Sequence, residues 1–296
     1  MTRSKATATG FMAILLWSLL ALFTVGSAPV PPFMLNALTF AVGGTVGLVW
    51  TMFGGGFRQL RGVPFRVYAF GTMGLFGYHF LYFSALRLAP AAEAGLICYL
   101  WPLLIVVFSG LMPGERLTAL HILGGLLAFA GTAVLILGKG GVLPDGAMTG
   151  FALALLAALT WALYSVLSRR IGEVPTASVA VFCLATAALS AIAHLGLETT
   201  EWPIGQAGWL SVLALGLGPV GLAFYVWDLG VKKGDIQLLG VVAYAAPLLS
   251  TLALVVAGIA RPTAHIAVAA LLITTGAALA AYASARIHRV LKVRRG

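Results

Sequence analysis

Long apolar segments follow one another along almost the whole chain, separated only by short turns. Windows of about 20 residues, the length that an α-helix needs to cross a bilayer, identify ten such segments. They cover residues 10–28, 32–53, 67–86, 91–112, 119–138, 147–168, 176–197, 206–228, 236–258 and 264–286. In hydrocarbon every backbone polar group must be paired within its own segment, which segments of this length achieve only as helices. We therefore expect an all-α, polytopic integral membrane protein with ten transmembrane helices.

The composition excludes a soluble alternative. Hydrophobic residues make up 61% of the chain and charged residues only 9%, which is more apolar surface than one soluble core can bury. The connections between the segments are short and contain Gly and Pro, so no separate soluble domain is expected.

The second half of the chain repeats the first half at a constant offset of 145 residues. The clearest aligned pairs are Tyr99 with Tyr244, Pro102 with Pro247, and Gly131 with Gly276. Because each half contains five segments, an odd number, the two halves must cross the bilayer in opposite senses. We expect two inverted five-helix repeats around a central cavity, residues 1–140 and 141–296, the second ending in a basic C-terminal tail.

The basic residues are distributed unevenly between the two faces of this predicted topology. With the N-terminus inside the cell, 15 of the 18 Lys and Arg residues fall on the cytoplasmic side. The remaining residues, on the outside, are Arg87, Lys139 and Arg261. This asymmetry follows the positive-inside rule and predicts that both termini are cytoplasmic. It explains the net charge of +10 through contact with the lipid bilayer, so we expect no nucleic-acid partner.

Acidic and basic side chains are absent from the middle of the predicted segments. Glu115 and Asp228 lie at segment ends, where a carboxylate commonly is solvated or caps a helix. The alternative is that Glu115, or Asp228 with Lys232 and Lys233, pairs with nearby basic residues and closes a cytoplasmic gate.

The sequence contains no pattern typical of an enzyme. It has no HExxH, no GxSxG and no paired carboxylates at membrane depth. Cys98 and Cys183 lie inside predicted segments without the spacing of a metal site, and we interpret them as packing residues. We therefore predict no catalytic activity, no metal and no cofactor.

Aromatic and weakly polar residues lie at mid-depth instead of charges. Tyr and Trp normally gather at the two membrane interfaces, and a buried hydroxyl or imidazole needs a hydrogen-bond partner that lipid cannot supply. Tyr78 and Tyr82 are four residues apart and so share one helix face. The residues that we predict to bind substrate in a central cavity are Trp17, Tyr78, His79, Tyr82, Tyr99, Trp101, Trp161 and Tyr244.

Two aligned prolines lie in the middle of predicted segments. Pro102 and Pro247 cannot donate to the carbonyl four residues earlier, so each should kink its helix and leave that carbonyl free. Each proline lies within three residues of a tyrosine. We expect the kinks to lie at the central cavity.

A resemblance to a known family rests on residues 85–118, ALRLAPAAEAGLICYLWPLLIVVFSGLMPGERLT, and on their second copy, residues 229–263. Both resemble the EamA-type repeat of the drug/metabolite transporter superfamily. The second copy departs from the pattern, because Ile259 and Ala260 replace Gly114 and Glu115. Within the superfamily, the chain is most similar to bacterial aromatic amino acid exporters.

This resemblance implies ten helices, a central cavity, and export of small neutral or zwitterionic metabolites across a bacterial inner membrane by alternating access. An aromatic amino acid is the expected substrate, and His79 is the candidate for a proton linkage because an unperturbed imidazole titrates near pH 6.5. The alternatives are an exporter of drugs or cationic metabolites with the same fold, and a channel or lipid-handling membrane protein. The oligomeric state is left open.

Overall fold

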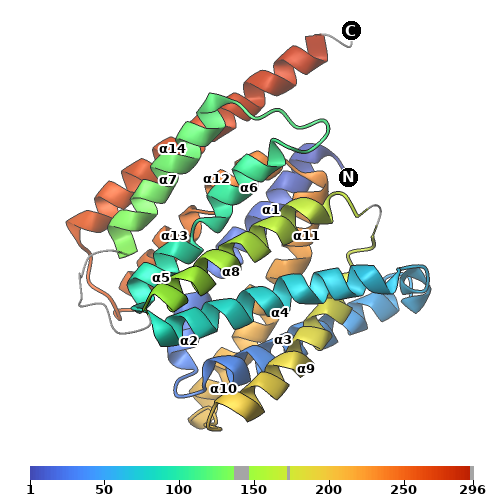
Figure 1. Ribbon diagram of the computed structural model, residues 1–296, viewed down its shortest axis with the longest axis vertical. Coiled ribbons are helices and arrows are strands. Elements are labelled where there is room, and N and C mark those ends of the chain that lie inside the picture. The colour runs from blue at the N-terminus through green and yellow to red at the C-terminus, as the bar shows by residue number, and fades with distance from the viewer. Residues whose placement is uncertain (137–146, 172–173, 294–296) are drawn as a thin grey trace.

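The computed structural model describes residues 1–136, 147–171 and 174–293, and this part of the chain contains helices and no strand (Figure 1). The helices are α1 (Arg3–Trp17), α2 (Leu20–Gly26), α3 (Pro32–Phe53), α4 (Phe65–Leu88), α5 (Ala91–Cys98), α6 (Trp101–Ser109), α7 (Ala119–Ile136), α8 (Ala147–Ser168), α9 (Ser178–Leu197), α10 (Gly205–Leu217), α11 (Ala223–Lys233), α12 (Ile236–Val242), α13 (Ala245–Val256) and α14 (Ala264–Val293). A 3-10 turn, η1 (Phe57–Leu60), precedes α4, and a π-helical turn, η2 (Gly218–Leu222), joins α10 to α11. The predicted all-α class is confirmed.

Seven helical segments are long and apolar enough to cross a membrane. They are Arg3–Gly26, Pro32–Phe53, Ala147–Ser168, Ser178–Leu197, Gly205–Lys233, Ile236–Val256 and Ala264–Ile287. Two shorter apolar segments, Glu93–Ser109 and Ala119–Leu135, accompany them. The protein is therefore a polytopic membrane protein, and the count of ten crossings stays a prediction. The predicted repeat boundary at residue 140, and Lys139, Arg294 and Arg295, lie outside the described residues.

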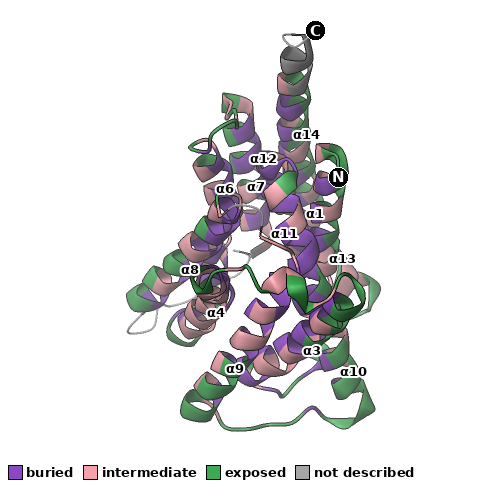
Figure 2. Ribbon diagram, turned by 90° about the vertical axis from the view of Figure 1, so that its right-hand side faces the viewer, coloured by how far each residue is buried: buried purple, intermediate pink, exposed green. Residues whose placement is uncertain are grey.

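Many residues of the helices are exposed (Figure 2), and a large share of these are apolar. Leu195 and Leu271 are typical, with 80% and 70% of their surface exposed. So much apolar surface would be unfavourable in water, whereas lipid tails cover it without cost.

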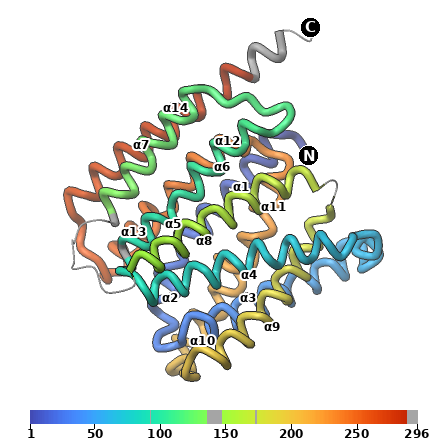
Figure 3. The backbone as a smooth tube through the Cα atoms, in the orientation of Figure 1, coloured from blue at the N-terminus to red at the C-terminus, as the bar shows by residue number. Residues whose placement is uncertain are grey.

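Helices that are far apart in sequence pair side by side. The most extensive pairs are α7 with α14, α3 with α9, α4 with α8, and α1 with α11 (Figures 1 and 3). The α7–α14 pair depends on glycine, because a Cβ atom on Gly276 would collide with the carbonyl oxygen of Gly124. Each pair joins a helix that precedes residue 137 to one that follows residue 146, so the two parts of the chain form one bundle.

Both ends of the described chain lie at the same end of this bundle (Figure 1). We call it the basic end, because Arg3, Arg66, Arg169, Arg170 and Lys232 lie there. That both termini face the cytoplasm stays a prediction.

The opposite end is fastened by one buried carboxylate. Glu198 follows α9 with a side chain only 1% exposed. It accepts hydrogen bonds from the backbone N–H groups of Phe33 (2.9 Å) and Met34 (3.1 Å) in the first turn of α3. It also pairs with Arg87 of α4 at 2.7 Å and with Nδ1 of His194 at 2.9 Å. A carboxylate at a helix N-terminus satisfies unpaired donors and opposes the helix dipole, so Glu198 joins α3, α4 and α9.

We expect Glu198→Gln to lower the free energy of unfolding by about 1–3 kcal/mol, because a buried, charge-assisted set of hydrogen bonds is lost. Unfolding of the purified protein in detergent, followed by temperature or denaturant, measures this change. Glu201→Gln is the matched control, since Glu201 lies three residues further on and is exposed. Equal stability of the two variants would contradict the assignment.

Candidate functional site

A cavity of about 130 Å³ lies between helices from both parts of the chain. Its described wall consists of aromatic and apolar residues with one histidine and one cysteine: Trp17, Leu20, Tyr78, His79, Tyr82, Cys98, Tyr99, Trp101, Trp161, Pro219, Val220, Phe224 and Ala246. Seven of the eight residues that the sequence suggested for substrate binding are among them. The described wall contains no Asp, Glu, Lys or Arg, and among the described residues no cluster of side chains could hold a metal ion.

Trp17, at the end of α1, organises one wall of the cavity. Its ring centroid lies 6.0 Å from that of Trp101 and 6.1 Å from that of Trp161, both edge-to-face. A third tryptophan, Trp227, packs 5.1 Å from Trp17, and its indole N–H donates to the Ser165 hydroxyl at 3.1 Å. Because edge-to-face contact is the favourable geometry for aromatic rings, this cluster holds α1, α6, α8 and α11 together around an aromatic surface.

A second wall comes from α4. Tyr78 and Tyr82 lie one helical turn apart and their rings stack, with centroids 6.0 Å apart and an interplanar angle of 7°. The Cys98 thiol lies 3.6 Å from the Tyr78 hydroxyl. His79 approaches the carbonyl oxygen of Leu75 through Nδ1 at 2.7 Å. Since a carbonyl oxygen can only accept, Nδ1 carries the proton of this bond, and Nε2 of the neutral ring is an acceptor.

The cavity lies where helices are interrupted. The helical pattern breaks between α1 and α2, between α5 and α6, and between α12 and α13, and a π-helical turn separates α10 from α11. Trp17, Tyr99 and Pro219 line the cavity at three of these breaks. Irregular backbone at membrane depth is tolerated where it is buried in protein or lines a cavity. The position of these breaks at the cavity therefore accounts for their presence in membrane helices.

The two mid-segment prolines lie directly after two of these breaks. Pro102 is the second residue of α6 and Pro247 is the third residue of α13. At the start of a helix the missing N–H of proline has no partner to lose. The prolines thus lie in the first turns of α6 and α13, and the kinks that the sequence suggested at Pro102 and Pro247 stay a prediction.

Tyr244 is the one predicted binding residue that the described wall does not include. Its side chain is fully buried, and its ring packs 6.0 Å from that of Phe129 in α7. Its hydroxyl accepts a hydrogen bond from the backbone N–H of Leu103 at 3.2 Å, in the first turn of α6. Its aligned partner Tyr99 faces the cavity. The two halves therefore use equivalent tyrosines differently in this conformation.

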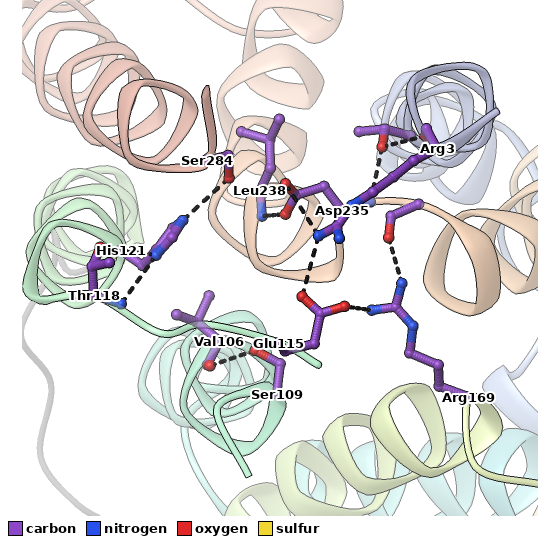
Figure 4. Close-up of polar contacts among 12 residues, drawn as sticks. Arg3, Val106, Ser109, Glu115, Thr118, His121, Arg169, Asp235, Leu238 and Ser284 are labelled. Carbon is purple, nitrogen blue, oxygen red and sulfur yellow. Dashed lines mark hydrogen bonds and ion pairs between the residues drawn. The ribbon is translucent and has the colours of Figure 1, made fainter. Parts of the chain in front are cut away.

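Ion pairs connect distant parts of the chain at the basic end (Figure 4). Glu115 accepts from Arg3 at 3.1 Å and from Arg169 at 2.6 Å, while Arg3 also lies 3.5 Å from Asp235. The carboxylates of Glu115 and Asp235 are 8% and 7% exposed. We call Arg3, Glu115, Arg169 and Asp235 the basic-end network.

The network is anchored to the backbone as well. Asp235 caps α12 by accepting from the N–H of Leu238 at 3.0 Å, and Arg169 donates to the carbonyl oxygen of Lys232 at 3.3 Å. Burial lowers the pKa of the Arg169 guanidinium, and the charge of Glu115 opposes that shift. Since a guanidinium keeps its charge in proteins, the network remains ionic.

Asp228, the second predicted gate residue, forms a separate pair. It lies on α11, 2.8 Å from Lys232 one turn further on, and accepts from the Thr176 hydroxyl at 2.9 Å. Lys232 also donates to the carbonyl oxygen of Val174 at 3.3 Å. The pair therefore ties α11 to the connection between α8 and α9.

Comparison with known proteins identifies the family. The model of the EamA-like transporter family matches the chain twice, over residues 5–137 and 148–282. The chain belongs to the EamA-like transporter family. A protein of Ancylobacter novellus named aromatic amino acid exporter YddG is 56% identical over 95% of this chain and 98% of its own length. The Escherichia coli protein of the same name is 26% identical over 85% of this chain and 88% of its own. A solved crystal structure that is 56% identical superposes with a TM-score of 0.89 over 94% of this chain and 98% of the other.

The protein is thus a membrane exporter and not an enzyme, because its family is a transporter family and its relatives are named as exporters. The sequence did not predict the apolar residues in the wall of the central cavity, which include Leu20, Val220 and Phe224. It also assigned Cys98 to packing. An apolar residue in a membrane helix carries no signal that separates a cavity wall from a lipid-facing surface. Phe224 could have been found only by its position one turn before Trp227.

Exchanging Tyr244 and Tyr99 for phenylalanine separates a structural tyrosine from a cavity tyrosine. Tyr244→Phe removes the acceptor of the Leu103 N–H, so we expect the free energy of unfolding in detergent to fall by about 1–3 kcal/mol. Tyr99→Phe, which removes a hydroxyl with no hydrogen-bond partner among the described residues, should leave stability unchanged. Loss of stability in Tyr99→Phe alone would contradict this assignment.

The basic-end network predicts that Glu115→Gln opens this EamA-like transporter at its basic end. Ser109, the last residue of α6, precedes Glu115 by six residues and is fully buried; its side chain is drawn in Figure 4. A Ser109→Cys probe, in a chain carrying Cys98→Ser and Cys183→Ser, should react faster with a thiol reagent when Glu115 is changed. A shift of about 1.4 kcal/mol between closed and open states corresponds to a tenfold faster reaction. Arg116→Gln, which alters an exposed neighbour, is the control, and an equal rate in both variants would count against the network as a closure.

Proposed function

We propose that this transporter exports aromatic amino acids from the bacterial cytoplasm by alternating access. The observation that carries the proposal is the central cavity, whose described wall combines aromatic rings with tyrosine hydroxyls and lacks charged side chains. The relatives named aromatic amino acid exporters support the same substrate class.

The size of the cavity suits one aromatic ring. Its volume of about 130 Å³ is close to that of the engineered apolar cavity of about 150 Å³ that binds benzene. A ring placed there can contact Trp17, Trp101 and Trp161 edge-to-face or in offset stacking, and each such contact contributes about 0.5–1.5 kcal/mol. The backbone of the amino acid needs additional space, which the breaks between α1 and α2 and between α5 and α6 can provide by small movements.

An amino acid is a zwitterion without net charge, so the cavity needs no fixed ion to hold it. The ammonium group can lie against aromatic faces and donate to Nε2 of His79. The carboxylate can accept from the hydroxyls of Tyr78, Tyr82 or Tyr99. A nucleotide sugar, in contrast, would require Lys or Arg beside its pyrophosphate, and the described wall contains neither.

Ten crossings in two inverted repeats, residues 1–140 and 141–296, are part of this proposal. The helix pairing supports them. We can replace each helix by the one that occupies the same place in the other proposed repeat. The α1–α11 pair then becomes the α4–α8 pair, whereas the α3–α9 and α7–α14 pairs each consist of two counterparts and stay the same. That is the behaviour of two copies related by a pseudo-two-fold axis, the usual origin of alternating access in transporters with a midplane site.

Both termini lie on the cytoplasmic side of the inner membrane in this proposal, because the basic end carries the residues that the positive-inside rule assigns to the cytoplasm. The basic-end network then closes the cytoplasmic side, and the cavity belongs to a conformation that faces outward. For export, the basic-end network must open so that the central cavity can bind substrate from the cytoplasm. The network must then close again.

Transport by protein reconstituted in liposomes tests the function. Saturable, stereoselective counterflow of labelled phenylalanine or tryptophan identifies a carrier. Aliphatic amino acids, polyamines and cationic drugs in the same panel separate an exporter of other metabolites or drugs, and unsaturable flux indicates a channel. Repeating the efflux with an imposed proton gradient shows whether His79 couples transport to protons; unchanged efflux removes that idea.

Replacing the central ring should weaken transport specifically. Trp17→Leu keeps an apolar residue but removes the ring that contacts Trp101 and Trp161, and we expect counterflow of tryptophan to require about tenfold more substrate. Trp209→Leu is the control, since Trp209 is 47% exposed on the outer surface of α10. If both variants transport like the wild type, the cavity is not the substrate site.

A further inference from the structure

A cavity of about 640 Å³ lies at the basic end and away from the central cavity. It is a cleft between the start of α4 and the connection from α8 to α9. Val63, Val67, Phe70, Ile171 and Val174 form its apolar surface. Its volume falls in the range of about 300–1,000 Å³ that is typical of ligand sites.

Two guanidinium groups line this cleft. Arg66 lies in the first turn of α4, and Arg170 follows the end of α8. Both residues are exposed, and among the described residues neither has an ion-pair partner. The N-terminus of α4, a helix of 24 residues, adds partial positive charge at the same place. A carboxylate can therefore bind there through charge-assisted and bidentate hydrogen bonds.

The cleft continues inward toward the central cavity. A second, much smaller void of about 10 Å³ shares Val67, Phe70, Ile171 and Val174 with the cleft. Its remaining lining includes Tyr164, Asp228 and Lys232. The void is about the size needed for a single water molecule, so the cleft ends at the Asp228–Lys232 ion pair.

One layer of aromatic rings separates this void from the central cavity. The ring of Phe70 lies 5.6 Å from that of Tyr164, which lies 5.2 Å from Trp161. Trp161 lines the central cavity, and Trp227, next to Asp228, packs 5.1 Å from Trp17. A path of aromatic side chains thus leads from the cleft, past the ion pair, to the proposed substrate site.

We propose that the cleft is an access site at which Arg66 and Arg170 bind the carboxylate of the substrate while the apolar surface around Phe70 receives its ring. The site captures the amino acid at the basic end before the Asp228–Lys232 pair parts and admits it to the central cavity. This inference rests on the proposed function and adds to it that the protein recognises the carboxylate of the substrate first.

The test compares two double variants with the same change in charge. Arg66→Gln with Arg170→Gln removes both guanidinium groups of the cleft. Arg58→Gln with Arg61→Gln removes two exposed arginines of the same end that are not among the described residues lining the cleft. Both are reconstituted in liposomes, and uptake of labelled phenylalanine is measured separately from the basic end and from the opposite end. Phenethylamine, which lacks the carboxylate, is the companion substrate.

For the cleft variant we expect KM for phenylalanine at the basic end to rise about three- to fivefold, the effect of losing a solvent-exposed charge pair. KM from the opposite end, and the transport of phenethylamine, should stay unchanged, and the control variant should match the wild type. Equal KM values in the two variants, or an equal loss for phenylalanine and phenethylamine, would overturn the proposal while leaving the proposed function intact.

The vesicle composition distinguishes a lipid headgroup from the substrate as the anion. In vesicles of phosphatidylcholine alone, which has no net charge, the cleft variant should still show the raised KM. If the effect occurs only when phosphatidylglycerol is present, Arg66 and Arg170 bind lipid, and the proposal is wrong. A wild-type protein that does not transport phenylalanine under either condition refutes the proposed function and this inference together.

Discussion

The requirement that every backbone polar group be paired inside the bilayer shapes this protein more than any single contact. Continuous helices meet the requirement by themselves, and interrupted ones need neighbours. The helix breaks at Tyr99, at Tyr244 and after Trp17, and the π-helical turn at Pro219, lie within one bundle instead of facing lipid. At one of these breaks a residue from the other part of the chain pairs a backbone group, because the Tyr244 hydroxyl accepts from the Leu103 N–H. The same interruptions leave room for a cavity. The site therefore lies where the backbone departs from continuous helix and its polar groups need partners.

Buried ion pairs lie toward the two ends of the bundle, away from the central cavity. The described wall of the central cavity has no Asp, Glu, Lys or Arg, whereas the basic-end network and Glu198 place buried carboxylates toward the two ends. Ion pairs near the ends are partly hydrated when they break, so the cost of opening is far smaller than for a pair in hydrocarbon. The proposed closure by ion pairs and the proposed recognition by aromatic rings therefore suit different depths of the membrane.

The sequence predicted the parts that depend on local pattern. Apolar length predicted the helical segments, and mid-depth aromatics predicted most of the cavity wall, because a Tyr or Trp away from the interfaces requires a special environment. What depends on tertiary packing could not be read. Leu20 and Phe224 look like lipid-facing residues, the partners of Glu115 come from residues 3 and 169, and Glu198 lies in a turn with no pattern around it. The repeat aligned Tyr244 with Tyr99 but carried no information on which one faces the cavity.

That last difference bears on the mechanism. In the proposed inverted repeat, an outward-facing and an inward-facing state are related by exchange of the conformations of the two halves. Here Tyr99 lines the cavity while Tyr244 caps the start of α6 through the N–H of Leu103. In such an exchange Tyr244 would turn to the cavity, and Tyr99 would take the equivalent position beside Leu248, which follows Pro247 as Leu103 follows Pro102. A cap that moved from one half to the other would keep the number of paired groups constant, so the two states of the proposed alternating-access cycle would have similar free energies.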